Sequence, residues 1–484
     1  MMRKQSLADV INEHPISIQA PDGGWGWMVV FSSFIFNMLL DGVIFTYGIF
    51  FPEFLRYFGE SKGKTQLLHS VLVGTCLVSG PVVSVLVNKF GSRNMAATGT
   101  VIASVGLFLS SFSPNLDVMF IFYSIAGGIG FGMFYLPSIV IVGIYFDKRR
   151  ALATGIAVCG AGVGAFVFAP FTKLLLETYD WRGTMWIMSA IMLNGVVFSS
   201  TFRPLGRDMN RNVKQINDAY DKCDTGTDKY PGGCYKQLCL PMKDMFDFSL
   251  LKSPTMLLYG ASCLLVMFGF FIPSNFLPVW ASDVNLSTEE GAFLILAMGV
   301  SNTITRVVIG YITDKPWANC LVINNTALLI GGLATCFVPF YTTFETLVIY
   351  AVAFGIVMAV FILLRSILMA ELLGVHRLNN SFGLVGLSMG LSTFVGSPLA
   401  GALSDISGNY NVAFYFGGIT IVLGGLICLP LRRISNWEQS RIKDFNLHHT
   451  FNSDQKNKRP DVKIMSAKKT LSVFTVSDST RDRN

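Results

Sequence analysis

The sequence predicts an all-α membrane protein with twelve transmembrane helices arranged as two six-helix bundles. Hydrophobic residues make up 52% of the 484 residues, whereas charged residues make up only 14%. The apolar residues lie in long blocks separated by short polar stretches, which is typical of a polytopic helical membrane protein. Two related short sequence motifs, which lie six apolar stretches apart, indicate that the chain contains two homologous halves.

Twelve apolar blocks reach the length of about 20 residues that a helix needs to cross a bilayer. They cover approximately residues 26–51, 66–88, 94–113, 117–145, 151–175, 183–202, 255–280, 291–313, 318–341, 346–370, 379–403 and 410–431. The phrase VNKFGSR at 87–93 follows the second block, and GYITDK at 310–315 follows the eighth. Repeats of this kind are expected in transporters built from two related halves.

The polar stretches divide the chain further. We predict a cytoplasmic N-terminal tail over residues 1–24, a first six-helix bundle over 25–203 and a second over 253–432. Residues 204–252 carry many charges of both signs, so they are interpreted as a cytoplasmic linker. Residues 433–484 are polar and rich in Ser, Thr, Lys and Arg, which favours a disordered cytoplasmic tail.

The distribution of basic residues predicts the orientation. Lys and Arg concentrate in every second connection, as in the run KRR at 148–150, and the opposite connections of the second half contain none. The positive-inside rule therefore places both termini in the cytoplasm. This topology also accounts for the net charge of +7, so we expect a lipid bilayer rather than nucleic acid as the partner. The first twenty residues show no removable signal peptide.

Arg306 lies well inside the apolar stretch 294–314. A charge at such a depth costs at least about 2.5 kcal/mol on insertion scales, and such residues usually face a bundle interior or a water-filled cavity. We therefore interpret Arg306 as a functional residue. The alternative is that Arg306 pairs with an acid and only fixes the packing of the helices.

Three other polar residues lie in predicted spans. Asp41, midway along the first span, is expected to pair with a cation such as Arg306, to be protonated or to face a wet cavity. Arg365, nearer the cytoplasmic end of the tenth span, is expected either to snorkel to the membrane surface or to line the solute pathway. His69 is interpreted as a hydrogen-bonded helix residue in preference to a proton sensor.

Two motifs carry a family resemblance. The run PDGGWGW at 21–27 opens the first span, and YFDKRRALATGIAVCGAGVG at 145–164 joins a cationic turn to a helix rich in small residues. Together they resemble the signatures of the monocarboxylate transporter family (solute carrier family 16) within the major facilitator superfamily. The resemblance implies the major facilitator superfamily fold, in which two bundles rock about a central site. It assigns motif and gating roles to Asp22, Gly23, Gly24, Trp25, Trp27, Lys148, Arg149 and Gly155.

The resemblance also implies a substrate site. In proton-coupled members, a lysine in span one and an aspartate and an arginine four residues apart in span eight carry the proton and the carboxylate. Arg306 matches the arginine, but Asn302 stands at the aspartate position and Phe45 at the lysine position. Neither of these can carry a proton, so facilitated diffusion or another coupling is expected. Asp41 is a further departure, and an acid beside Arg306 suits a zwitterion such as creatine, carnitine or an amino acid.

The sequence therefore predicts a plasma-membrane carrier of a small carboxylate, with a facilitative zwitterion carrier or a non-transporting membrane sensor as alternatives. An enzyme is not expected, because neither an HExxH motif nor a paired acid and histidine cluster is found. The run GGIGFG at 127–132 is not interpreted as a dinucleotide site, because no strand–helix unit surrounds it. No cofactor or metal is expected. Several members of the family associate with a single-span immunoglobulin-like glycoprotein, which is thus a candidate partner.

Overall fold

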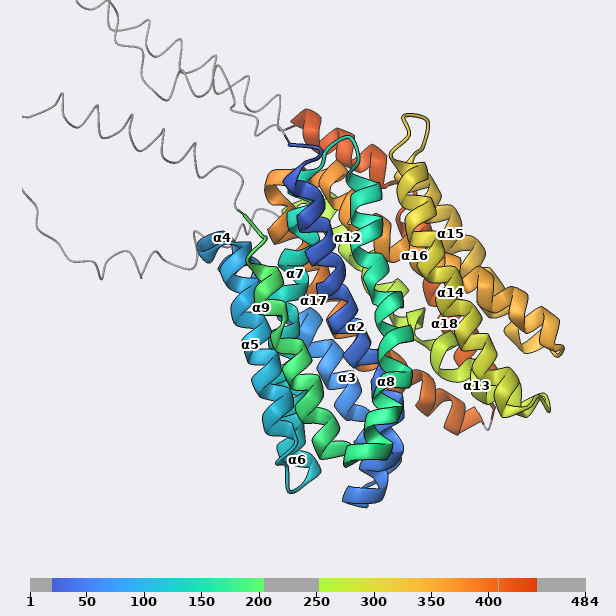
Figure 1. Cartoon of the computed structure of the whole chain (residues 1–484). Coiled ribbons are helices and arrows are strands. Elements are labelled where there is room, and N and C mark those ends of the chain that lie inside the picture. Colours follow the sequence, from blue (N-terminus) through green and yellow to red (C-terminus); the bar gives the residue numbers. More distant parts are fainter. Residues whose placement is uncertain (1–19, 204–251, 408, 442–484) are drawn as a thin grey trace, which may run out of the picture. The chain divides into compact units, whose positions relative to one another are not determined.

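The computed structural model describes residues 20–203, 252–407 and 409–441, and all regular elements in these residues are helices (Figure 1). Most of the predicted N-terminal tail, the central linker and the tail beyond residue 441 lie outside the described residues. Residues 1–429 and 430–484 form separate compact units. In the second unit residues 431–441 are helical, although a disordered tail was predicted from residue 433. The membrane bundle described below belongs to the first unit.

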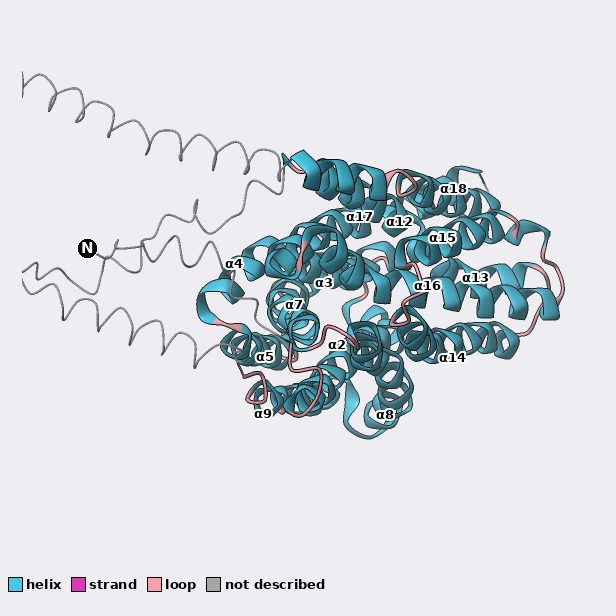
Figure 2. Ribbon diagram, turned by 90° about the horizontal axis from the view of Figure 1, so that it is seen from above, coloured by secondary structure: helices cyan, strands magenta, loops and turns pink. Residues whose placement is uncertain are grey.

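Each half of the bundle is a group of helices, which Figure 2 shows from above. The first half contains α2 (Trp25–Phe58), α3 (Lys62–Val78), α4 (Gly80–Phe90), α5 (Ser92–Ser110), α6 (Leu116–Met119), the π-helix η1 (Phe120–Ala126), α7 (Gly127–Tyr145), α8 (Arg150–Leu193) and α9 (Gly195–Ser199). The second contains α12 (Pro254–Phe270), α13 (Ile272–Asp283), α14 (Thr288–Thr313), α15 (Cys320–Cys336), α16 (Phe344–Leu373), α17 (Leu378–Ser407) and α18 (Asn411–Ile427), with short 3₁₀ turns at Val338–Phe340 and Val375–Arg377.

Helices are the expected solution here, because a bilayer offers no hydrogen-bond partners and each span must satisfy its own backbone. Eight helices in the described residues are long and apolar enough to cross a membrane, and the bent pair α3–α4 makes a ninth. The prediction of twelve spans is consistent with this count. Helices α8 and α9 cover most of the fifth and sixth predicted spans, with a break in the helical geometry at Asp180 (φ 59°, ψ 174°). Helices α5 and α15 correspond to the third and ninth predicted spans.

Two predicted spans are broken. The α3–α4 pair bends by 45° after Val78, and α12 ends at Phe270 before α13 begins. Pro81 and Pro273 lie at the first or second positions of α4 and α13. Proline lacks a backbone N–H and is tolerated at such positions, where no helical bond is lost. The prolines therefore begin new helices where the apolar pattern predicted continuous ones.

The halves meet along two seams, where α8 packs against α14 and α17 packs against α3 and α4. Glycine allows the main chains to approach closely at both. A Cβ on Gly155 of α8 would lie 2.5 Å from the carbonyl oxygen of Arg306, and one on Gly80 of α4 would lie 2.6 Å from that of Gly383. Small residues have this role in many membrane helix contacts. The seams hold Arg306 at the boundary between the halves.

Candidate solute-binding cavity

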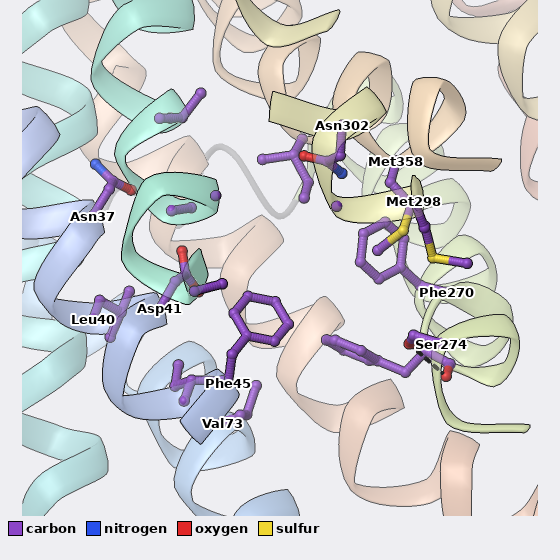
Figure 3. A pocket seen from close by; sticks show the side chains of 18 of the residues that line it. Asn37, Leu40, Asp41, Phe45, Val73, Phe270, Ser274, Met298, Asn302 and Met358 are labelled. Carbon is purple, nitrogen blue, oxygen red and sulfur yellow. Dashed lines mark hydrogen bonds between the residues drawn. The ribbon is translucent and has the colours of Figure 1, made fainter. Parts of the chain in front are cut away.

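A cavity of about 480 Å³ lies between the two halves, and its size is in the range of ligand pockets. Its wall is formed by residues of α2, α3, α7 and α8 on one side and of α12, α13, α14, α16 and α17 on the other. Figure 3 shows Asp41 and Phe45 on α2 facing Asn302 on α14 and Met358 on α16 across this space. Most of the lining residues are apolar. The wall thus offers only a few polar groups to a solute.

The structure brings together the four residues that the sequence predicts for substrate binding, because Arg306, Asp41, Asn302 and Phe45 all line this cavity. Arg306 is only 6% exposed, and its Nη1 donates a hydrogen bond to the Val158 carbonyl of α8. Its buried Nε has no hydrogen-bond partner among the described residues. A guanidinium carries five N–H donors, so most of those on Arg306 are available to a solute.

Asp41 does not form the direct ion pair with Arg306 that was one of its expected arrangements. In the described part of the chain, no basic nitrogen lies within 4.0 Å of its carboxylate. The two side chains nevertheless line the same cavity. Asp41 is half-buried in the cavity wall, where its carboxylate can receive a donor from a solute.

Arg365 is a third charged residue of the same wall, and the sequence did not decide its position. It is only 3% exposed, so the snorkelling interpretation is wrong. Its Nη2 donates to the Tyr135 hydroxyl of α7 at 2.8 Å, and its guanidinium lies over the Phe382 ring at 4.6 Å from the centroid. Tyr135 was not singled out from the sequence, because nothing in its neighbourhood marks it as a partner of a distant arginine.

A second cavity, of about 690 Å³, shares Val73, Phe271 and Ser274 with the first. It leads away from Arg306 along α3, where Gln66 and His69 line it. His69 stacks on Tyr47 with ring centroids 5.1 Å apart, and its buried Nδ1 lacks a hydrogen-bond partner. The hydrogen-bonded histidine expected from the sequence is therefore not observed at Nδ1. The two cavities together extend from Arg306 toward the first turns of α3.

Polar contacts join the halves at the other end of the bundle, called here the terminal end because residues 20–24 begin there (Figure 1). Asp314, directly after α14, accepts hydrogen bonds from the backbone N–H groups of Ala151 and Leu152 in the first turn of α8, both at 2.8 Å. An anion is favoured at such a helix start. Burial raises the pKa of the Asp314 carboxyl, while the two N–H bonds act in the opposite direction.

The second seam carries an amide contact at the same end. Asn88, near the end of α4, donates a hydrogen bond from its side-chain amide to Asn380 at 2.7 Å and accepts one from Asn379 at 2.7 Å. It thus has two neutral partners on α17. With Asp314, these contacts close the terminal end of the bundle.

The first family motif meets the beginning of the second at the terminal end, away from the cavity. The Asp22 carboxylate accepts hydrogen bonds from the backbone N–H groups of Asp147 at 2.7 Å and Lys148 at 2.9 Å. Gly23 and Gly24 form the turn into α2, and Gly24 has a φ of +57° that favours glycine. The side chains of Lys148 and Arg149 are exposed. These residues connect the start of α2 with the α7–α8 turn.

The tryptophans of the first motif strengthen the same junction. Trp25 donates from Nε1 to the Thr201 carbonyl at 2.9 Å, and Trp27 packs edge to face against Phe146 with ring centroids 5.1 Å apart. Of the motif residues predicted for gating, only Gly155 adjoins the candidate site, because it lies against the main chain of Arg306.

Comparisons with known proteins agree with this architecture. The model of the Major Facilitator Superfamily matches residues 28–341 and 320–477. Monocarboxylate transporter 12 of Xenopus laevis is 31% identical over 427 residues, covering 86% of this chain and 90% of that protein. Monocarboxylate transporter 9 of Pongo abelii is 28% identical over 485 residues, covering 87% and 95%.

Solved structures show the same fold. The proton:xylose symporter XylE, bound to 6-bromo-6-deoxy-D-glucose, superimposes with a TM-score of 0.61 at 16% identity and covers 83% of this chain and 94% of that one. The Escherichia coli fucose:proton symporter FucP gives a TM-score of 0.60 at 13% identity, with coverage of 83% and 97%. The protein is thus a multi-pass membrane transporter that belongs to the monocarboxylate transporter family of the Major Facilitator Superfamily.

Proposed function

We propose that this protein is a secondary carrier that moves a small carboxylate-bearing solute across the plasma membrane by alternating access. The observation that supports this most directly is Arg306, a buried guanidinium in the wall of a cavity between the halves, whose hydrogen-bond acceptor in the described part of the chain is the Val158 carbonyl. Arginine binds a carboxylate through two parallel N–H bonds, which gives both affinity and orientation. The names of the relatives, monocarboxylate transporters, agree with this class of solute.

The difference between the two ends of the bundle supports alternating access. The contacts of Asp314 and Asn88 hold the terminal end together, whereas the second cavity continues the central one toward the other end. With both termini in the cytoplasm, as the basic connections predict, this arrangement faces the cell exterior. Breaking the contacts at the terminal end would then release the solute to the cytoplasm.

The mode of transport proposed is facilitated diffusion or a coupling different from the family's proton relay. Phe45 and Asn302, which occupy the positions of the relay lysine and aspartate, lack a titratable group and both line the cavity. A facilitative carrier of a zwitterion is the second candidate. It is favoured by Asp41, whose carboxylate in the same cavity has no basic partner within 4.0 Å among the described residues.

The test is uptake of labelled lactate, creatine and carnitine by cells expressing the full chain, at mildly acidic and at neutral pH. We expect uptake of at least one of them, and we expect Arg306→Ala to lose it although the variant reaches the cell surface. Unchanged KM and rate in Arg306→Ala would contradict the carboxylate role. Binding of a solute without any flux would instead indicate a sensor. Lactate uptake that rises strongly in acid would show that a proton route survives.

A further inference from the structure

Arg365 of α16 is a buried cation without an acidic partner. Its side chain is only 3% exposed, and among the described residues no carboxylate lies within 4.0 Å of it. The acceptors that it does have are neutral, namely the Tyr135 hydroxyl and the thioether sulfur of Met389, each at 2.8 Å. None of the residues that the structure describes accepts a hydrogen bond from its buried Nε.

This arrangement is unusual for a structural arginine. A guanidinium stays charged in a protein, and buried charges are normally paired because removing them from water is costly. A thioether is only a weak acceptor, and the ring of Phe382 supplies only a part of the missing stabilisation. The partner that balances Arg365 must therefore come from the cavity that it lines.

The charges of the cavity wall point to the class of that partner. Among the described residues that line it, only Arg306, Arg365 and Asp41 have side chains that ordinarily carry a formal charge at neutral pH. Their formal charges sum to +1 when Asp41 is ionised and to +2 when it is protonated, so the site has an excess of positive charge in both cases. The remaining wall is mostly apolar, and unbalanced charge is costly in such surroundings.

We infer that Arg365 is a second anion-binding residue and that the cavity selects solutes of net charge −1 over neutral zwitterions. This inference rests on the proposed function and narrows it. Two kinds of solute share the required charge. A simple monocarboxylate would place its single anionic group between the two guanidiniums, whereas an acidic amino acid would place a carboxylate on each and its amine on Asp41.

The experiment compares the uptake of labelled lactate, glutamate, creatine and carnitine by the full chain and its variants, normalised to the amount at the cell surface. The wild type is expected to favour lactate or glutamate over both neutral zwitterions. Arg365→Gln should lower the ratio of anion to zwitterion uptake about tenfold or more, because hydrogen bonds to charged groups are the strong ones. Arg365→Lys keeps the positive charge but lacks the planar set of N–H donors of a guanidinium, so it should retain a part of the selectivity.

The matched control is Arg56→Gln, which removes an exposed arginine that pairs with Glu53 on α2. It should leave the ratio unchanged. A wild type that prefers neutral zwitterions would overturn the inference while leaving the carrier function intact, and so would an Arg365→Gln variant that reduces all solutes equally. Failure of the wild type to move any carboxylate solute would refute the proposed function itself. If Arg365→Gln does not reach the cell surface, the ratio of anion to zwitterion uptake is measured for Arg365→Lys instead. A ratio equal to that of the wild type would then overturn the inference.

Discussion

Gly155 lies directly against the main chain of Arg306, and a Cβ placed on it would come within 2.5 Å of the Arg306 carbonyl oxygen. This contact joins a motif residue of α8 to the residue proposed to bind the carboxylate. The position of the guanidinium therefore depends on the distance between two helices that belong to different halves.

Gly155→Ala is accordingly expected to push α8 and α14 apart. Overpacking of this kind costs about 1–3 kcal/mol, and the displacement would move Arg306 away from the solute. We expect lower thermal stability in detergent and a higher KM for uptake. Gly48→Ala on α2 is the control, because its Cβ would meet no atom within 4 Å. Equal KM values in the two variants would show that the seam tolerates the methyl group.

Asp22→Ala is expected to loosen the junction between the two family motifs. The change removes the acceptor of two backbone N–H bonds, those of Asp147 and Lys148, and should lower the free energy of unfolding by about 1 kcal/mol. The thermal unfolding midpoint measures this loss. Lys148→Ala is a sharp control, because Lys148 contributes its main-chain N–H and the bond survives the substitution. An equal loss of stability in both variants would mean that the lysine side chain matters instead.

Asp314→Asn is expected to weaken the closure of the terminal end. An amide has one acceptor oxygen, so one of the bonds to Ala151 and Leu152 is lost together with the attraction of a carboxylate to the helix start. A loss of about 1 kcal/mol would shift the balance between closed and open forms about fivefold. The measurement is the rate at which a water-soluble maleimide, applied from the terminal end of membrane vesicles, labels a cysteine introduced at Asn302.

The labelling rate is compared with two controls. The chain without the introduced cysteine gives the background from native thiols such as Cys159. Glu177→Gln, an exposed carboxylate on α8 far along the sequence from its first turn, should not change the rate. Labelling of Asp314→Asn no faster than that of this control would disprove the closing role.

Asp41→Asn separates the two candidate solute classes. If Asp41 receives the amine of a solute, the variant should lose uptake of amine-bearing solutes about tenfold, because a charged hydrogen bond disappears. Simple monocarboxylates should be retained, since the wall becomes more positive. Parallel uptake assays of glutamate and lactate give the answer. Retention of all amine-bearing solutes would show that Asp41 does not bind their cationic end.

Much of the fold could be predicted from the sequence, because a bilayer forces each span to be helical and apolar over a known length. The breaks at Pro81 and Pro273 were missed. Apolar length alone does not reveal whether a proline kinks a span, begins a new helix or is accommodated by its neighbours. The two halves were foreseen from the phrases at 87–93 and 310–315, which the structure places near the terminal end.

The candidate site was only partly predictable. Arg306 stood out because a charge deep in a span is rare, but its acceptor at Val158 belongs to another half of the chain and leaves no local signal. Arg365 could not be assigned, because snorkelling and burial depend on the depth and rotation of α16. The partners of Asn88, which are Asn379 and Asn380 of α17, are likewise far away in the sequence and leave no local signal.

The close approach of main chain to main chain along the seams has a mechanical consequence. Where Gly80 meets Gly383 and Gly310 meets the Ala151 carbonyl, main chain lies against main chain, so no side chain has to be displaced at these points when one half turns against the other. Elsewhere along the seams the Phe394 ring packs on Gly74 and the Thr303 side chain on Gly162. The hydrogen bonds of Asp314 and Asn88 at the terminal end add a polar resistance to the motion. The strength of these few hydrogen bonds at the terminal end would thus influence the turnover rate of the carrier, while the long helices move as rigid units.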